Sequence, residues 1–156
     1  EDMANLCDVF YIGGTKNGAL LGEAVVFNDS NLGNEFDFAL KQKGALLAKG
    51  RVLGIQFLEL FKDDLYSELA LHANKMAKKI SKAIKDRGFS FLTESKTNQI
   101  FPILPNGIIE KLSKKYQFYV WKKVDENHSA IRLITSWSTQ EREVEALIQD
   151  FQELNQ

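Results

Sequence analysis

The sequence predicts an α/β chain, with a strand–loop–strand segment and helices ahead of a small α+β unit. Three observations support this: an apolar first segment, a long amphipathic helix in mid-chain, and short strands alternating with helices after it. The 156 residues are 44% hydrophobic, which provides enough apolar material for one folded core. We therefore expect an ordinary folded protein rather than a disordered or fibrous one.

The balance of charges excludes several classes of partner. Twenty basic and 21 acidic residues are spread along the chain, so no basic stripe predicts binding to nucleic acid or an anionic membrane. Cys7 is the single cysteine, which rules out an intrachain disulfide and a multi-cysteine metal site. No apolar run approaches the ~20 residues of a membrane span. We expect a cytoplasmic protein without a metal.

The first apolar segment, residues 6–12, is rich in Val, Phe, Tyr and Ile and shows little polar alternation. That pattern suits a strand buried on both faces of a parallel sheet. The segment follows the first residue closely and no methionine opens the chain, so we expect a start inside a longer polypeptide. A second apolar segment, residues 24–27, follows a turn-forming stretch, which places Lys16 at the tip of a loop between two strands.

Helical spacing dominates the middle of the chain. Residues 35–44 and 46–61 are expected to form helices, with Gly44 and Gly50 as breaks. A longer helix over 64–87 has one apolar stripe, with Asp63 or Asp64 as its cap. Its expected C-terminus has Lys85 and Arg87 in the last turn and Gly88 immediately after.

The last third predicts an antiparallel sheet with helices on one face. Strands are expected at 89–92, 99–104, 118–122 and 130–136, with a helix after Asn106. Ser138 and Glu141 have the spacing of a capping box for a final helix. The buried face of that helix would comprise Val144, Leu147, Ile148, Phe151 and Leu154.

Lys16 lies in the glycine-bounded stretch Gly13-Gly-Thr-Lys-Asn-Gly18, which lacks the order of a phosphate-binding P-loop. Locally it predicts only a tight turn. The wider string over residues 8–27, DVFYIGGTKNGALLGEAVVF, resembles the cofactor-lysine segment of the threonine aldolase and aromatic amino acid β-eliminating lyase family. These are fold type I enzymes that use pyridoxal 5'-phosphate.

The resemblance implies that Lys16 holds pyridoxal phosphate as a Schiff base and is catalytic. The amine must lie near the aldehyde, be desolvated, and leave when an amino acid replaces it. Glycines around the lysine would leave room for the cofactor ring. The hydroxyl of Thr15 would contact the cofactor phosphate.

Two arginine segments extend the resemblance. Residues 49–58, KGRVLGIQFL, are similar to the segment whose arginine, here Arg51, approaches the cofactor phosphate from a neighbouring subunit. Alternatively, Lys49 and Arg51 are a solvated helix start. Residues 130–137, AIRLITSW, are similar to the strand whose arginine, here Arg132, binds the substrate α-carboxylate.

Arg132 also has support from its own surroundings, because it interrupts an apolar run and a lone arginine in a buried strand needs an anionic partner. A structural salt bridge or an outward-facing edge position would explain it equally well. Thr97 and Asn98 resemble a Thr-Asn pair that leads into a strand of the family's small domain. Alternatively, Asn98 only shapes a turn. His72 and His128 are expected at the surface, without a catalytic role.

The resemblance covers nearly the whole chain and implies a fragment of a fold type I enzyme. Residues 1–62 would end the large cofactor domain and residues 63–156 would form the small C-terminal domain. The missing N-terminal half of the enzyme would carry much of the cofactor pocket, so this chain alone is expected to be inactive.

The intact enzyme would cleave a β-hydroxy-α-amino acid such as threonine or allo-threonine to glycine and an aldehyde. Because Arg51 would act across subunits, a homodimer or homotetramer is expected. A different lyase reaction, β-elimination, would keep the cofactor and Lys16 and stays open, because the groups that choose the reaction would lie mostly in the missing half. So does a non-catalytic α+β interaction domain, although an exposed apolar first strand argues against it.

Overall fold

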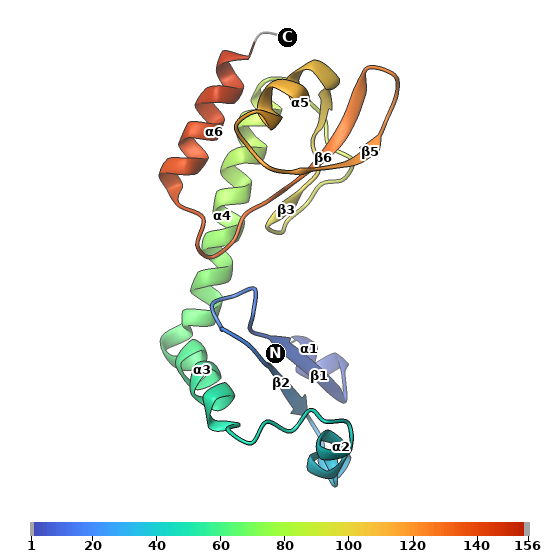
Figure 1. Ribbon diagram of the computed structural model, residues 1–156, viewed down its shortest axis with the longest axis vertical. Coiled ribbons are helices and arrows are strands. Elements are labelled where there is room, and N and C mark those ends of the chain that lie inside the picture. Colours follow the sequence, from blue (N-terminus) through green and yellow to red (C-terminus); the bar gives the residue numbers. More distant parts are fainter. Residues whose placement is uncertain (1, 155–156) are drawn as a thin grey trace. The chain divides into compact units, whose positions relative to one another are not determined.

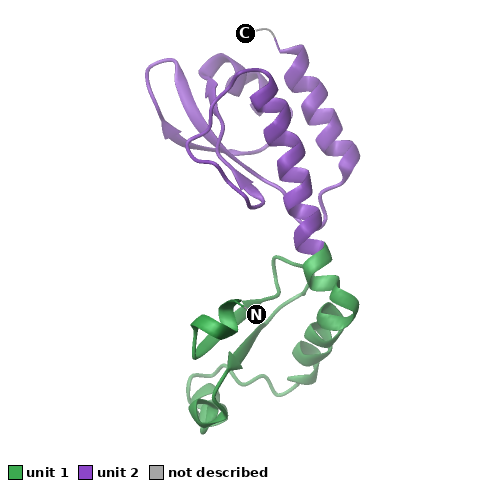
Figure 2. Ribbon diagram, turned by 180° about the vertical axis from the view of Figure 1, so that it is seen from behind, with its two compact units in different colours: residues 1–68 green, residues 69–156 purple. Residues whose placement is uncertain are grey.

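The computed structural model describes residues 2–154. The chain divides into two compact units, residues 1–68 and 69–156 (Figure 2). The boundary falls inside helix α4 (Leu65–Asp86). The division expected from the family resemblance, between residues 62 and 63, stays a prediction.

Unit 1 consists of a two-stranded hairpin with one short helix before it and further helices after it (Figure 1). Strands β1 (Val9–Gly13) and β2 (Glu23–Phe27) pair antiparallel, with Val9 opposite Phe27 and Gly13 opposite Glu23. The helical elements are α1 (Asp2–Leu6), η1 (Ser30–Gly33), α2 (Phe36–Gln42), α3 (Arg51–Phe61) and η2 (Lys62–Asp64).

The expectation of a fully buried parallel first strand is wrong for the described residues. The loop after β1 returns the chain directly beside it, so β2 pairs antiparallel, and no further strand joins them within residues 2–154. Tyr11 is 69% exposed, and Val9 and Val25 on the same face are also exposed. One face of the hairpin therefore lacks a layer to cover it.

The two helices expected in unit 1 are present with different bounds, whereas α1, η1 and η2 were not expected. Helix α2 lies within the expected range, whereas α3 begins at Arg51 rather than at residue 46. Gly44 has a φ of 70°, which ends α2, and residues 48–50 form a turn before α3 starts. The buried apolar residues of this unit are Ala19, Phe57 and Leu60.

Unit 2 is an antiparallel sheet with helices packed on it, as expected (Figure 1). Strand β6 (His128–Ile134) takes the centre, between β5 (Tyr119–Lys123) on one side and β3 (Gln99–Ile100) and β4 (Ile103–Pro105) on the other. The helices are α4, α5 (Asn106–Ser113) and α6 (Glu141–Glu153).

The two strands expected first in this unit are weaker than the sequence suggested. The expected strand at 89–92 is reduced to a single bridge between Phe91 and Pro102. The expected strand at 99–104 is split into β3 and β4 around Pro102, because proline has no N–H to donate to a ladder.

Helix α4 ends as expected. Gly88 has a φ of 81°, its N–H donates to the carbonyl of Lys85 at 2.8 Å, and the N–H of Phe89 donates to that of Ile84 at 3.3 Å. This is the left-handed glycine termination predicted for the helix. At the other end, Asp63 and Asp64 have positive φ values of 50° and 60° in a 3₁₀ turn, so no extended cap residue precedes α4.

The expected capping box of α6 is wrong. The residue before the helix is Gln140, and no side chain caps it. Ser138 instead takes part in a turn, in which the Ser136 N–H donates to Thr139 Oγ1 at 2.8 Å and the Ser138 N–H donates to Ser136 Oγ at 3.3 Å. The apolar face of α6 is as expected.

One hydrophobic core lies between the sheet and the three helices of unit 2. Its fully enclosed members include Met76 of α4, Leu104 of β4 and Ile131 of β6. Helix α6 runs alongside α4, where the guanidinium of Arg87 donates to the backbone carbonyls of Phe151 and Leu154. No helix among residues 2–154 is both long and apolar enough to span a membrane.

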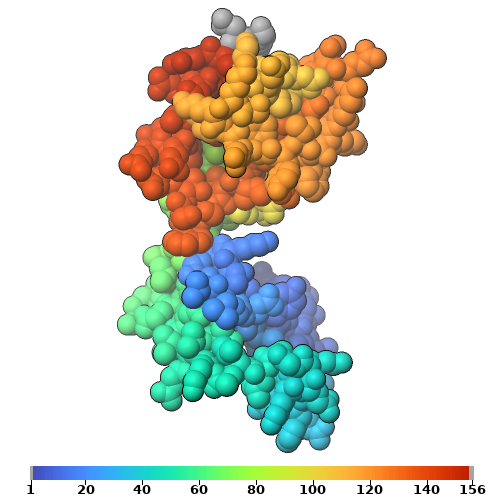
Figure 3. All heavy atoms as spheres, in the orientation of Figure 1, coloured from blue at the N-terminus to red at the C-terminus, as the bar shows by residue number. Residues whose placement is uncertain are grey.

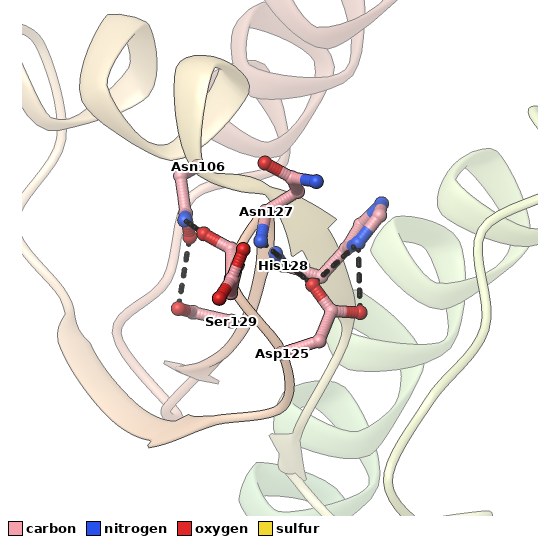
Figure 4. A network of polar contacts seen from close by, with 6 residues as sticks. Asn106, Asp125, Asn127, His128 and Ser129 are labelled. Carbon is pink, nitrogen blue, oxygen red and sulfur yellow. Dashed lines mark hydrogen bonds and ion pairs between the residues drawn. The ribbon is translucent and has the colours of Figure 1, made fainter.

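Polar contacts fix the β5–β6 turn (Figure 4). The Asp125 carboxylate accepts the backbone N–H groups of Asn127 and His128, each at 2.7 Å, and lies 3.0 Å from Nδ1 of His128. Ser129 Oγ donates to Oδ1 of Asn106 at 2.9 Å, which ties the start of α5 to β6. Because the His128 ring is engaged with Asp125, this histidine serves the turn.

Candidate functional site

Lys16 lies at the tip of the loop that joins β1 to β2. The N–H groups of Asn17 and Ala19 both donate to the carbonyl of Gly14, at 2.9 and 3.0 Å, which closes a tight turn over residues 14–19. Lys16 and Thr15 are exposed at this turn. No hydrogen bond or ion pair engages the Lys16 ammonium within residues 2–154, so the amine is accessible to a ligand.

Long-range hydrogen bonds hold the base of this loop between β1 and β2 (residues 14–22, the lysine loop). Asn17 Nδ2 donates to the carbonyl of Tyr66 at 2.8 Å, and the Tyr66 hydroxyl donates to the carbonyl of Gly13 at 2.8 Å. On the returning side, the Leu20 N–H donates to Oε1 of Gln56 at 2.6 Å. The loop therefore has a fixed base and an exposed tip.

Glycines make this loop possible. Gly14 is buried, and a Cβ there would lie 2.7 Å from Cβ of Ala19 and 2.9 Å from Cζ of Phe57. Gly18 has a φ of 102°, a conformation that L side chains rarely adopt. The glycines predicted to give space to a cofactor thus first allow the loop to fold against α3.

Arg51 is the first residue of α3 and is exposed. The same helix packs Phe57 against Gly14 and Leu53 against Gly22, so the lysine loop and α3 form one piece. No hydrogen bond or ion pair joins Arg51 to Lys16 in the described part of the chain. Arg51 is thus accessible at the start of a helix that supports the loop.

Arg132 lies in unit 2, on the central strand β6. The alternative of an edge position is wrong, because β6 has neighbours on both sides. A structural salt bridge does not explain it either: across residues 2–154 the Arg132 guanidinium has no ion pair, and its buried Nε has no hydrogen-bond partner. The expectation that this arginine awaits an anion stays a prediction.

Two other residues singled out in the sequence have structural roles. Asn98 Nδ2 donates to the carbonyl of Thr135 at 2.7 Å, and the Thr135 N–H donates back to the Asn98 carbonyl at 3.0 Å, which pins the start of β3 to the end of β6. His72 is half-buried rather than at the surface, with Nε2 2.7 Å from the carbonyl of Thr139. Both side chains are engaged in holding unit 2 together.

Sequence reasoning missed the residues that support the site. Gln56 accepts a hydrogen bond from Leu20, 36 positions away, and Tyr66 donates one to Gly13, 53 positions away. Nothing in the local sequence of Gln56 or Tyr66 indicates this role. Tyr119 and Trp121, whose rings flank Arg132, carried a weak indication, since aromatic residues two apart on a strand share a face.

Comparison with known proteins relates the chain to one enzyme family. It is 32% identical over 145 residues to the low specificity L-threonine aldolases of Pseudomonas aeruginosa and of a second Pseudomonas strain, which covers 92% of this chain and 41% of each relative. The solved structure of Leishmania major threonine aldolase superposes with a TM-score of 0.92 at 39% identity. The chain matches the threonine aldolases over part of their length.

The comparisons confirm the predicted resemblance to part of the threonine aldolases and the predicted α/β fold. It covers 97% of this chain and 44% of the Leishmania threonine aldolase, so the chain spans less than half the length of the relatives it matches. A search against protein-family models gave no match. The threonine aldolase relationship therefore rests on whole-chain similarity in sequence and fold.

Proposed function

We propose that this chain is the C-terminal part of a pyridoxal-phosphate-dependent threonine aldolase, which cleaves a β-hydroxy-α-amino acid to glycine and an aldehyde. The observation that carries the proposal is Lys16, which has no partner among residues 2–154 and lies at the exposed tip of a loop with a fixed base, in a chain related to threonine aldolases. An accessible amine can bond to the cofactor aldehyde, and the desolvation that a Schiff-base lysine needs would come from polypeptide outside this chain.

The residues of the lysine loop fit the cofactor. The loop offers an exposed amine at Lys16, a hydroxyl at Thr15 and small residues on either side, while Arg51 offers a guanidinium at the start of α3. A guanidinium and a hydroxyl are both suitable partners for a phosphate. When bound, pyridoxal phosphate supplies a sink for the electrons released at the substrate Cα.

Arg132 would hold the α-carboxylate of the substrate. Fixing that group orients the Cα–Cβ bond for cleavage, and an arginine without an acceptor in the described part of the chain has donors free for it. A base from outside this chain would take the proton of the β-hydroxyl, while His72 and His128 contact Thr139 and Asp125 within unit 2. The cytoplasmic location stays a prediction.

The proposal requires further polypeptide. The threonine aldolases that match are more than twice as long as this chain, and we propose that a corresponding N-terminal half completes the pocket around Lys16. An arginine that reaches a phosphate in a neighbouring subunit would make the enzyme a homodimer or homotetramer. The 156 residues alone are then expected to be inactive.

Lys16→Ala in the full protein that carries this chain tests the proposal. We expect loss of the visible absorbance of lysine-bound cofactor and loss of glycine release from threonine and allo-threonine, because the amine is removed. Lys43→Ala, an exposed lysine beyond the loop, is the matched control and should leave both unchanged. An unaltered spectrum in the Lys16→Ala protein would overturn the assignment, and a keto acid in place of glycine would indicate β-elimination.

A further inference from the structure

The guanidinium of Arg132 lies against two aromatic rings of the neighbouring strand. Its Cζ is 5.0 Å from the ring centroid of Tyr119 and 5.3 Å from that of Trp121. Both distances are within the ~6 Å at which a cation is attracted to the face of an aromatic ring. Phe101 packs against Trp121 with a centroid separation of 5.3 Å, so the indole is itself supported.

The strand geometry creates this arrangement. Tyr119 is the direct partner of Arg132 in the β5–β6 register, so their side chains leave the same face of the sheet. The register then shifts between Val120 and Lys122, and Trp121 is the extra residue of the irregularity. Despite this irregularity the Trp121 ring lies beside Arg132, as side-chain alternation along a strand predicts for a residue two positions from Tyr119.

A comparison within unit 2 separates this arginine from a structural one. Arg87 also lies near two rings, 5.8 Å from Phe89 and 5.3 Å from Phe151, but its guanidinium donates to two backbone carbonyls. Arg132 has the rings without the acceptors, and its buried Nε is left without a partner among the described residues.

Ring faces and hydrogen-bond acceptors use different parts of a guanidinium. The rings attract the flat face of the cation, whereas its N–H donors point outward in the plane. An arginine held only by rings is therefore fixed in orientation while its in-plane donors stay free. Tyr119 and Trp121 are 68% and 54% exposed, and the β5–β6 hairpin, coloured orange, lies at the surface of unit 2 (Figure 3).

We propose that Tyr119 and Trp121 are positioning residues that hold the plane of the Arg132 guanidinium for a carboxylate ligand. The inference rests on the proposed function, in which that carboxylate belongs to the amino-acid substrate. It adds that substrate affinity depends on two aromatic side chains that touch the arginine.

The test measures the dissociation constant of glycine by calorimetry, with KM and kcat for threonine cleavage, in the full protein that carries this chain. Tyr119→Ala and Trp121→Ala should each weaken glycine binding and raise KM by about 3- to 20-fold, with little change in kcat. Tyr119→Phe and Trp121→Phe keep a ring and should retain affinity. Val120→Ala, an exposed position between them, is the matched control.

A double-mutant cycle separates positioning from general damage. In an Arg132→Ala background the ring substitutions should cause no further loss, because the group that they orient is gone. An equal further loss would overturn the inference. If an alanine variant fails to fold, Tyr119→Leu and Trp121→Leu replace it, since leucine keeps apolar bulk without the ring.

The outcomes distinguish the inference from the proposed function. If Arg132→Ala weakens glycine binding and the ring variants do not, the positioning role alone is overturned. If Arg132→Ala has no effect, or the unaltered protein does not bind glycine, the carboxylate role of Arg132 is overturned and the inference falls with it.

Discussion

Gly14 shows at the scale of a single residue how the lysine loop is held. A Cβ at this position would meet Cβ of Ala19 at 2.7 Å and Cζ of Phe57 at 2.9 Å, and an alanine methyl cannot rotate away. We expect Gly14→Ala to destabilise the protein by about 1–3 kcal/mol, because the loop or α3 must shift. Thermal and denaturant unfolding of the purified chain would measure the loss.

Gly54→Ala is the matched control for that substitution. Gly54 lies in α3, is exposed, and has no atom within 4 Å of an added Cβ. Since alanine loses less backbone freedom than glycine in a helix, this variant should be stabilised by about 0.5–1 kcal/mol. Shifts of the same sign in both variants would contradict the packing around Gly14.

Candidate site residues could be proposed from the sequence, but their surroundings could not. Lys16, Thr15, Arg51 and Arg132 came from a resemblance in local strings, and their roles stay predictions. The supports of the loop and the rings beside Arg132 depend on which distant segments fold together. Local pattern carries no information about such pairings, which explains why Gln56 and Tyr66 were missed.

At the scale of elements, a contact between α5 and α6 gives the second unit a pH dependence. The Asp150 carboxylate of α6 lies 2.5 Å from Nζ of Lys115 and accepts the Tyr116 hydroxyl, both just after α5. The Lys115 hydrogen bond, and then that of Tyr116, lower the pKa of Asp150. Burial, followed by the Asp150 contact, raises the pKa of the Tyr116 phenol, which stays protonated and donates.

The sign of the pH effect follows from that lowered pKa. A carboxylate with a lower pKa in the folded than in the unfolded state stabilises the protein above the unfolded pKa of about 3.9. The stabilisation is lost as the pH falls through the folded pKa. Asp150→Asn should therefore lower the melting temperature at about pH 7, and the difference should vanish as the pH falls below the folded pKa of Asp150.

A melting-temperature difference that persists in acid would contradict this account. Asp86→Asn is the control, because the Lys82–Asp86 pair joins two positions of one helix and links no elements. It should have a smaller effect at neutral pH than Asp150→Asn.

The elements that the sequence predicted well are the ones with strong periodicity. Helix α4 was expected at 64–87 and occupies Leu65–Asp86, because its apolar stripe and Gly88 mark it clearly. The capping box of α6 failed because serine and threonine hydroxyls at 136–139 form a local turn instead. The direction of β1 depends on a pairing partner, which its own residues do not specify.

At the scale of the whole molecule, the two units differ in how much apolar surface each buries. Unit 2 encloses one continuous core, whereas unit 1 buries only a few apolar residues and leaves Leu6, Tyr11, Leu20 and Phe38 exposed. Amide hydrogen exchange of the 156-residue chain should therefore be slow in β6 and α4 beyond Leu69 and much faster in β1 and β2.

The same measurement on the full protein should show the hairpin of unit 1 protected, if an N-terminal half covers its apolar face. Amide exchange in β6 should change little between the 156-residue chain and the full protein, which makes that strand the internal reference. Equal protection of both units in the 156-residue chain would contradict the difference in burial.

The anchoring of the lysine loop also has a consequence for the order of synthesis. The groups that fix its base come from Gln56 and Tyr66, so the ribosome makes the loop first and its farthest support 53 residues later. At ~5–20 residues per second, roughly 3–10 s pass between the two. During that interval the base of the loop lacks its support from Tyr66, so Lys16 could capture the proposed cofactor in its final geometry only after translation has passed the start of α4.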